Sequence, residues 1–262
     1  MIGAAREIGG DTGGTAGAAR PIRFEVADAE ELAVVPAGSV DLIVSAAAAH
    51  WFDMPRFWRA AGRVLKPGGT VALWVGGAIR PDADFLPDQV VAGEIQAAVD
   101  EFDAEVDAFL MPGNRLCVGL YRDLGMPWDD GRHPRTDSSA GAGAGAGEGE
   151  GGQDAGEVFD KETFRRVEWG TQTPGSLPMA EFLANGGREV PLDALEMVLG
   201  TASYVTRWRE ANAHLAGTGA DVVKKFRAKV QAALERAGLP ADRIRGGMLG
   251  VLLLVKKKAT LE

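Results

Sequence analysis

The sequence predicts an α/β fold, in which helices cover a sheet of buried strands, and residues 40–75 carry this prediction. The near-continuous apolar run at 40–45 is typical of a parallel strand buried on both faces. Apolar residues then recur at helical spacing from Phe57 to Leu65, and a second apolar run follows at 70–75. Strand, helix and strand in this order form the crossover unit of an open parallel sheet.

Both ends of the helix in this unit have sequence signals. Asp53 can cap the first turn, where Pro55 is tolerated because the N–H groups there have no helical partner. The run K-P-G-G at 66–69 ends the helix, because proline cannot continue it and the glycines allow the chain to reverse. We therefore expect the second strand to begin at Thr70.

The same stretch resembles class I S-adenosylmethionine-dependent methyltransferases, whose strand–helix–strand segment ends in R-V-L-K-P-G-G. Residues 63–69 match this motif in full, and A-H-W-F-D at 49–53 is similar to the branch that includes trans-aconitate methyltransferases. The resemblance implies a Rossmann-like sheet with helices on both faces, S-adenosyl-L-methionine as cofactor and a small-molecule acceptor. It also implies that the fourth, fifth, seventh and sixth strands of the class lie side by side, with the seventh antiparallel.

Two elements of the family's cofactor site have no counterpart here, the glycine loop after the first strand and the acid that ends the second. The resemblance implies that this chain starts just past them, so we expect a sheet without its first two strands and weak cofactor binding. The glycine-rich run at 9–19 does not replace the loop, because it leads from a helix fragment into a strand. We interpret it as a linker.

Residues 22–26 alternate in polarity and match the third strand of the family. The resemblance assigns the adenine contacts to the carboxylate of Asp28 and the backbone of Ala29, and it adds Ser45 to the cofactor-binding residues. The simpler alternative is that Asp28 caps the turn that leads to Leu32. Because the first two strands of the sheet are expected to be absent, the strand that begins at Ile22 would lie on a free sheet edge or pair with the strand at 40–45.

His50 follows the end of the strand at 40–45, where open α/β sheets bind ligands, and is the candidate catalytic residue. It can orient the acceptor, act as a base toward a hydroxyl, or be a structural histidine. The resemblance favours a carboxylate oxygen as acceptor, which needs alignment and exclusion of water rather than a base. Trp51 and Trp74 are further candidates for the substrate pocket.

Residues 86–128 correspond to a helical insertion that roofs the acceptor pocket in the family. Val91, Ile95 and Val99 begin a regular helical stripe that continues to residue 110, with acidic residues on its other face. Tyr121 and Trp128 can line the roof or belong to the core. We expect the acidic face to be a solvated surface rather than a metal site.

The C-terminal half completes the incomplete methyltransferase domain, residues 1–136 and 157–262. Residues 137–156 are rich in glycine, alanine and glutamate and predict a disordered insertion. We expect strands at 164–169 and 248–255, a short helix at 177–183, a long helix at 192–215 and a last helix from residue 222. Tyr204 and Trp208, four residues apart in a family-like segment, are pocket candidates or a packing pair.

Composition excludes several other classes of function. A formal net charge of −9 argues against nucleic acid, and three scattered histidines with one cysteine predict no metal site. No signal peptide is evident and no apolar run could span a bilayer, which predicts a cytoplasmic protein. The alternatives to an enzyme are an inactive truncated paralogue or a gene-model fragment. A nicotinamide-dependent oxidoreductase would need a glycine fingerprint that is not found. The oligomeric state stays open.

Overall fold

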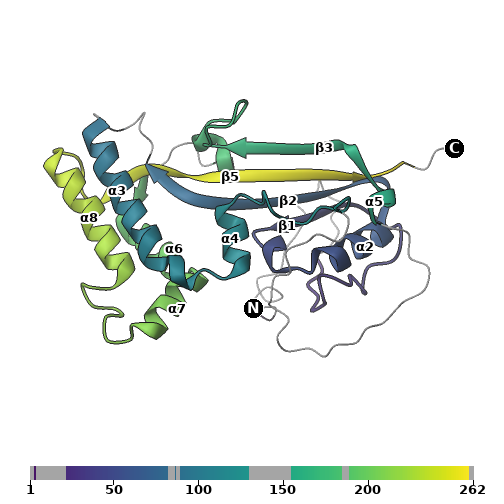
Figure 1. Ribbon diagram of the computed structural model, residues 1–262, viewed down its shortest axis with the longest axis horizontal. Helices are drawn as coiled ribbons and strands as arrows, with labels where there is room; N and C mark the ends of the chain where they lie inside the picture. Colours follow the sequence, from purple (N-terminus) through teal and green to yellow (C-terminus); the bar gives the residue numbers. More distant parts are fainter. Residues whose placement is uncertain are drawn as a thin grey trace, which may run out of the picture.

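The computed structural model describes residue 3 and residues 22–81, 86, 89–129, 155–184 and 189–259. One sheet runs through the molecule, with its strands in the order β1-β2-β5-β3 and β4 beside β5 (Figure 1). Its strands are β1 Val40–Ala46, β2 Leu65–Pro81, β3 Phe159–Trp169, β4 Glu189–Pro191 and β5 Arg243–Lys257. β1 and β2 are parallel, whereas β5 is antiparallel to both β2 and β3. This agrees with the predicted fourth, fifth, seventh and sixth strands.

The predicted crossover helix is α2, Met54–Val64, and it begins as the sequence indicates. The carboxylate of Asp53 accepts a hydrogen bond from the backbone N–H of Arg56 at 3.1 Å. β2 follows directly at Leu65, earlier than the expected start at Thr70, and a register shift opposite the first residues of β1 accommodates the glycines. Gly68 has a positive φ of 74°, which only glycine adopts without cost.

Most of the remaining helices form two groups along the sheet. η1 and α5 lie near α2, while α3, α6, α7 and α8 gather at the opposite end, the left of Figure 1. Their bounds are η1 Ala49–Trp51, α3 Gln89–Val106, η3 Asp107–Phe109, α4 Pro112–Val118, α5 Ala155–Val158, η5 Met179–Ala184, α6 Leu192–Gly200, α7 Ser203–Ala211 and α8 Val222–Arg236.

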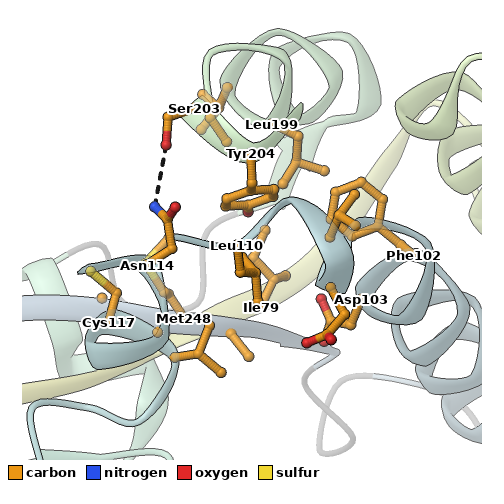
Figure 2. A pocket seen from close by; sticks show the side chains of 18 of the residues that line it. Ile79, Phe102, Asp103, Leu110, Asn114, Cys117, Leu199, Ser203, Tyr204 and Met248 are labelled. Atoms are coloured by element: carbon orange, nitrogen blue, oxygen red, sulfur yellow. Dashed lines mark hydrogen bonds between the residues drawn. The ribbon is translucent and has the colours of Figure 1, made fainter. Parts of the chain in front are cut away.

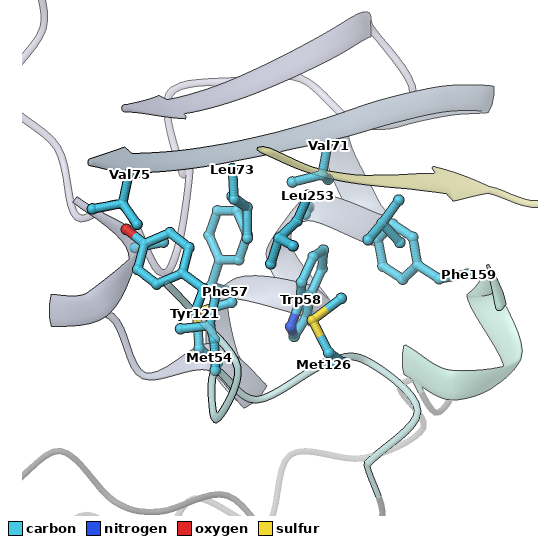
Figure 3. Packing of buried hydrophobic residues seen from close by; sticks show 14 of the residues in the cluster. Met54, Phe57, Trp58, Val71, Leu73, Val75, Tyr121, Met126, Phe159 and Leu253 are labelled. Atoms are coloured by element: carbon cyan, nitrogen blue, oxygen red, sulfur yellow. The ribbon is translucent and has the colours of Figure 1, made fainter. Parts of the chain in front are cut away.

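Two separate hydrophobic cores result. The first, which we call the sheet core, fills the space between α2 and the strands (Figure 3) and contains Met54, Phe57, Trp58, Val71, Leu73, Tyr121, Phe159 and Leu253 among others. The second, the helical core, joins α3, α6, α7 and α8 and contains Val91, Ile95, Val99, Phe102, Val106, Leu199, Trp208, Phe226 and Val230 among others. The predicted stripe of α3 is the part of this core that faces α8.

Helices lie on both faces of the sheet, as predicted. α2 packs against the face that carries Leu73, and on the opposite face η5 places Phe182 edge-on to the ring of Trp74, with centroids 6.0 Å apart. That opposite face is open at β1, where Leu42 and Val44 are 55% and 56% exposed.

The strand expected at residues 22–26 is not formed. Residues 22–28 have no regular structure, and Ile22 and Val26 are exposed. A strand needs a neighbour for its N–H and C=O groups. None of the described strands pairs with this segment, and the backbone of Asp28 instead starts a turn that ends at Leu32.

The single helix expected at 192–215 is two helices, α6 and α7. Between them Ala202 has an extended ψ of 133°, and the Thr201 hydroxyl donates to the carbonyl oxygen of Val198 at 2.7 Å. Gly200 precedes this break, and a threonine that bonds to the preceding turn competes with the helical pattern. The break turns Ser203 and Tyr204 toward the sheet, where the site described below lies.

Some predictions fall outside the described residues. They are the helix fragment at the N-terminus, the linker at 9–19, the glycine pair after the short helix η5, and residues 137–154 of the low-complexity insertion. The last two residues of that insertion, Ala155 and Gly156, begin α5. Among the described helices, none combines the length and apolar character needed to cross a lipid bilayer.

Candidate functional site

A cavity of about 470 Å³ lies between the two cores, past the point where β1 ends. The second half of β2 forms its floor, α3 and α4 form two walls, and the α6–α7 break closes a third (Figure 2). Its lining includes His50, Trp51, Gly76, Gly77, Ile79, Phe102, Asp103, Leu110, Asn114, Cys117, Leu199, Ser203, Tyr204 and Met248. The size suits a small organic molecule.

His50, Cys117 and Tyr204 of the cavity are uncharged at neutral pH, and the carboxyl groups of Asp103 and Asp107 also line it. Burial lowers the pKa of His50 to about 4 and raises the pKa of the Cys117 thiol to about 12. Burial and the nearby carboxylate of Asp103 raise the pKa of Tyr204. Burial also raises the pKa of Asp103 itself, although Arg80 lies 4.0 Å away and opposes this. Low local polarity strengthens any hydrogen bond made to a ligand here.

One wall is held by a hydrogen-bond network around Asn114. The Asn114 side-chain oxygen accepts from the Arg207 guanidinium at 2.6 Å and from the backbone N–H of Met111 at 3.0 Å. Its amide nitrogen donates to the hydroxyl oxygen of Ser203 at 3.2 Å, the dashed line of Figure 2. Because Ser203 accepts this bond, its own O–H is available to the cavity.

His50 lies on η1 and is 6% exposed. Its Nδ1 is 3.2 Å from the hydroxyl oxygen of Tyr121, while its ring stands 4.8 Å from that of Trp51. α4 approaches η1 so closely that Gly113 has no room for a side chain. A Cβ there would lie 2.7 Å from the carbonyl oxygen of His50 and 2.9 Å from the Trp51 ring. The close packing fixes where the imidazole sits.

The structure brings together His50, Trp51 and Tyr204 of the predicted pocket residues. The other four lie elsewhere. Trp74 packs on η5 at the opposite face of the sheet, and Trp208 is buried in the helical core. Tyr121 packs in the sheet core (Figure 3), and its hydroxyl oxygen lies 3.2 Å from Nδ1 of His50. Trp128 also packs against the sheet core.

The residues that the resemblance assigns to the cofactor lie outside the cavity lining. The carboxylate of Asp28 accepts from the N–H of Glu30 at 2.7 Å and faces Arg56 at 3.8 Å, as the alternative turn interpretation expects. Ala29 lies in this turn. Ser45 is different, because its hydroxyl is buried near the end of β1 and has no hydrogen-bond partner. An orphaned hydroxyl at the ligand-binding edge of the sheet fits a polar group of a cofactor.

The sequence did not single out Asp103, Asn114 or Cys117 as site residues. Asp103 lies on the acidic face of α3, where a solvated surface is the simpler prediction, and it enters the cavity only because Arg80 and Tyr204 lie across from that face. One local feature of the sequence could have indicated a role for Asn114. It is the third residue of α4 and its side chain closes a capping box. Among the described residues, no group of three or more histidine, cysteine, aspartate or glutamate side chains could hold a metal ion.

Comparison with solved structures gives distant likenesses to methyltransferases. Among solved structures, a type II methyltransferase from Anaeromyxobacter dehalogenans is 23% identical, with a TM-score of 0.48, covering 91% of this chain and 72% of that one. A loganic acid methyltransferase with S-adenosylhomocysteine is 11% identical, with a TM-score of 0.32, 87% of this chain and 64% of that one. These likenesses are too distant to transfer a function.

Sequence comparison is more informative for the N-terminal part. A protein of Dictyostelium discoideum named as a methyltransferase is 37% identical over 59 residues, 22% of this chain and 22% of that protein. A Saccharomyces cerevisiae protein named as an S-adenosylmethionine-dependent methyltransferase is 36% identical over 69 residues, 26% of this chain and 23% of that protein. The match therefore spans under a quarter of either relative. A methyltransferase domain model matches residues 3–73, which include η1, α2 and the R-V-L-K-P-G-G motif. The predicted resemblance is confirmed there, and residues 3–73 carry the sequence of a methyltransferase domain.

Proposed function

We propose that this chain takes part in S-adenosylmethionine-dependent methyl transfer to a small-molecule acceptor, and that the cavity between the two cores binds this acceptor. The observation that carries the proposal is the position of His50 and Trp51. Both lie in the segment that matches the methyltransferase domain, and both line a cavity of about 470 Å³ at the end of the strands. Ligands of open α/β sheets bind at this edge.

We propose a carboxylate oxygen as the acceptor atom. His50, Ser203 and Tyr204 bring neutral hydrogen-bond donors to the cavity, and its apolar walls exclude water. A carboxylate held this way needs no base, because it is already ionised at neutral pH and its oxygen lone pairs can attack the methyl group. The carboxylate of Asp103 works against an anionic acceptor, and its raised pKa and the nearby Arg80 reduce that opposition.

Ser45, Asp28 and Ala29 are the described residues that would hold the cofactor. When bound, S-adenosyl-L-methionine supplies an electrophilic methyl group on a sulfonium. The buried hydroxyl of Ser45 would bond to a polar group of the cofactor, and Asp28 would need to open its bond to the Glu30 N–H or share it. What the chain contributes to the reaction is alignment of the acceptor and exclusion of water.

Methyl transfer from labelled S-adenosylmethionine to a panel of small acids, alcohols and amines tests the proposal. We expect product with an acid and a large loss of turnover in Gly113→Leu, whose side chain would displace η1. A matched control is Gly93→Leu, because Gly93 on α3 has no atom within 4 Å of a Cβ position. Transfer to amines alone would reject the carboxylate acceptor while keeping the methyltransferase.

The second candidate is a chain that has the acceptor side of the site and no activity of its own. The turn around Asp28 and the open edge of β1 favour this second candidate. The resemblance places the adenine contacts at the end of a strand, and here Asp28 follows no strand. Isothermal titration of S-adenosylmethionine into the chain separates the two. Micromolar binding supports the enzyme, and absence of binding supports the inactive chain.

A cytoplasmic location and the absence of nucleic-acid partners remain predictions of the sequence.

A further inference from the structure

Tyr121 connects the sheet core to the candidate site through one hydroxyl group. The side chain is 2% exposed and packs among the rings of the sheet core. Its hydroxyl oxygen is 3.2 Å from Nδ1 of His50. The backbone N–H groups of Ala49 and His50 act on the same oxygen and lower the pKa of Tyr121, against the larger effect of burial, which raises it. The hydroxyl therefore meets three polar groups of η1 at once.

The direction of the hydrogen bond between Tyr121 and His50 follows from which groups can accept the Tyr121 proton. Backbone N–H groups can only donate, so those of Ala49 and His50 cannot take it. Nδ1 of His50, 3.2 Å from the hydroxyl oxygen, is the acceptor in reach.

A neutral imidazole that accepts at Nδ1 carries its proton on Nε2. We propose that Tyr121 is a positioning residue that holds His50 in this tautomer, so that Nε2–H donates a hydrogen bond to the methyl acceptor. The described residues give Nε2 no partner, and His50 lines the cavity. His50 then orients an acceptor oxygen and is not the base that removes its proton.

The surroundings of His50 keep it neutral. Burial lowers its pKa to about 4, and the titratable groups near it, Tyr121 and Cys117, have raised pKa values and stay uncharged at neutral pH. No charge therefore competes with the Tyr121 hydrogen bond in the choice of tautomer.

The backbone is strained where it aims these two groups. Ala47 before η1 has φ of 48°, and Leu120 and Tyr121 have φ of 52° and 57°. Such left-handed conformations are unfavourable for residues with a Cβ, and they persist where the surrounding structure demands them. Three such residues on the two loops that form one contact indicate that the contact is held tightly.

Nitrogen-15 NMR of histidine-labelled protein reads the tautomer directly, with the His50→Gln variant to assign the signals. We expect Nδ1 unprotonated and Nε2 protonated at neutral pH. Tyr121→Phe removes only the hydroxyl, and we expect a mixture of tautomers there. The matched control Tyr204→Phe removes the chain's other tyrosine hydroxyl and should leave the nitrogen shifts of His50 unchanged. A proton on Nδ1 in the wild type, or an unchanged tautomer in Tyr121→Phe, overturns the inference.

The role toward the acceptor rests on the proposed function and has its own test. Glutamine can place an amide N–H near the position of Nε2, whereas asparagine reaches only that of Nδ1. We expect His50→Asn to lose about ten- to a hundredfold in kcat/KM and His50→Gln to lose at most about threefold, as for a lost hydrogen bond to a charged group. Equal losses in both variants overturn the donor role. If the wild type methylates nothing, the proposed function fails, while the NMR result still decides the tautomer.

Discussion

The two hydrophobic cores of this protein are built in different ways. The sheet core forms around residues 40–75, a continuous segment, and is filled by aromatic rings such as Trp58 and Phe159, whose centroids are 5.2 Å apart. The helical core joins α3 to α8, segments more than a hundred residues apart, and ion pairs run along its rim. The first core is organised around one local unit that distant residues such as Phe159 complete, whereas the second forms only when distant helices pair. The cavity lies between them, so its shape depends on how they dock.

Trp58→Ala should have the largest effect on stability and should act on the sheet core. The side chain is 1% exposed, packs between Phe57 and Phe159, and donates to the carbonyl oxygen of Gly125 at 2.9 Å. We expect a loss of about 3–5 kcal/mol in the free energy of unfolding, measured by chemical denaturation. Trp51→Ala, at a residue 37% exposed, is the matched control. Equal losses would contradict the view that the rings of the sheet core dominate.

Asp221→Ala is the corresponding test of the helical core. The Asp221 carboxylate is fully buried, caps α8 through the N–H of Val223 and accepts from the Arg209 guanidinium at 2.8 and 3.1 Å. Removing it leaves a partly buried cation without its partner, which we expect to cost about 3 kcal/mol. The control is Asp242→Ala, where loss of an exposed pair with Arg243 should change the stability little. Hydrogen exchange should show the loss in α8 and not in α2.

Glu168 makes the stability of the sheet side depend on acid, as the lowered pKa of Asp221 does for the helical core. Burial alone would raise its pKa, but hydrogen bonds from Thr171, Arg166 and Thr173 outweigh this and lower it from 4.5 to about 2. A lowered pKa in the folded state contributes stability that is present above pH 4.5 and is lost as the pH falls toward 2. Glu168→Gln should flatten the fall in unfolding free energy over this range. An unchanged fall in the unfolding free energy of Glu168→Gln between pH 4.5 and about 2 would contradict the lowered pKa of Glu168.

The rim of the helical core should give the smallest effects. Lys229 and Lys225 of α8 pair with Glu101 and Glu105 of α3, and Arg236 pairs with Glu94 at 2.7 Å. Lys229→Ala should cost about 0.5 kcal/mol, and the cost should shrink at high salt because exposed pairs are screened. A loss that persists at high salt would show that the lysine stem, and not its charge, matters.

The predicted residues that line the cavity are marked by features close to them in the chain, whereas the lining residues that the sequence did not single out meet the others only in space. His50 and Trp51 follow a strand directly, and Tyr204 lies in a recognisable segment. Asp103, in contrast, faces the cavity because Arg80 and Tyr204 lie opposite it, and neither is near it in sequence. Trp208 and Tyr204 share a face of α7 and both contact the helical core, but Tyr204 also lines the cavity whereas Trp208 does not.

The sequence by itself determined the crossover unit, the order of the central strands, the stripes of α3 and α8 and the family of residues 3–73, because these follow from local periodicity and a contiguous motif. Only the tertiary structure decided that residues 22–28 form no strand, that residues 192–215 form two helices, and that Tyr121 supports His50. Each of these depends on a partner elsewhere in the chain. A strand exists only when paired, and a side chain's role depends on the groups within a few ångströms of it.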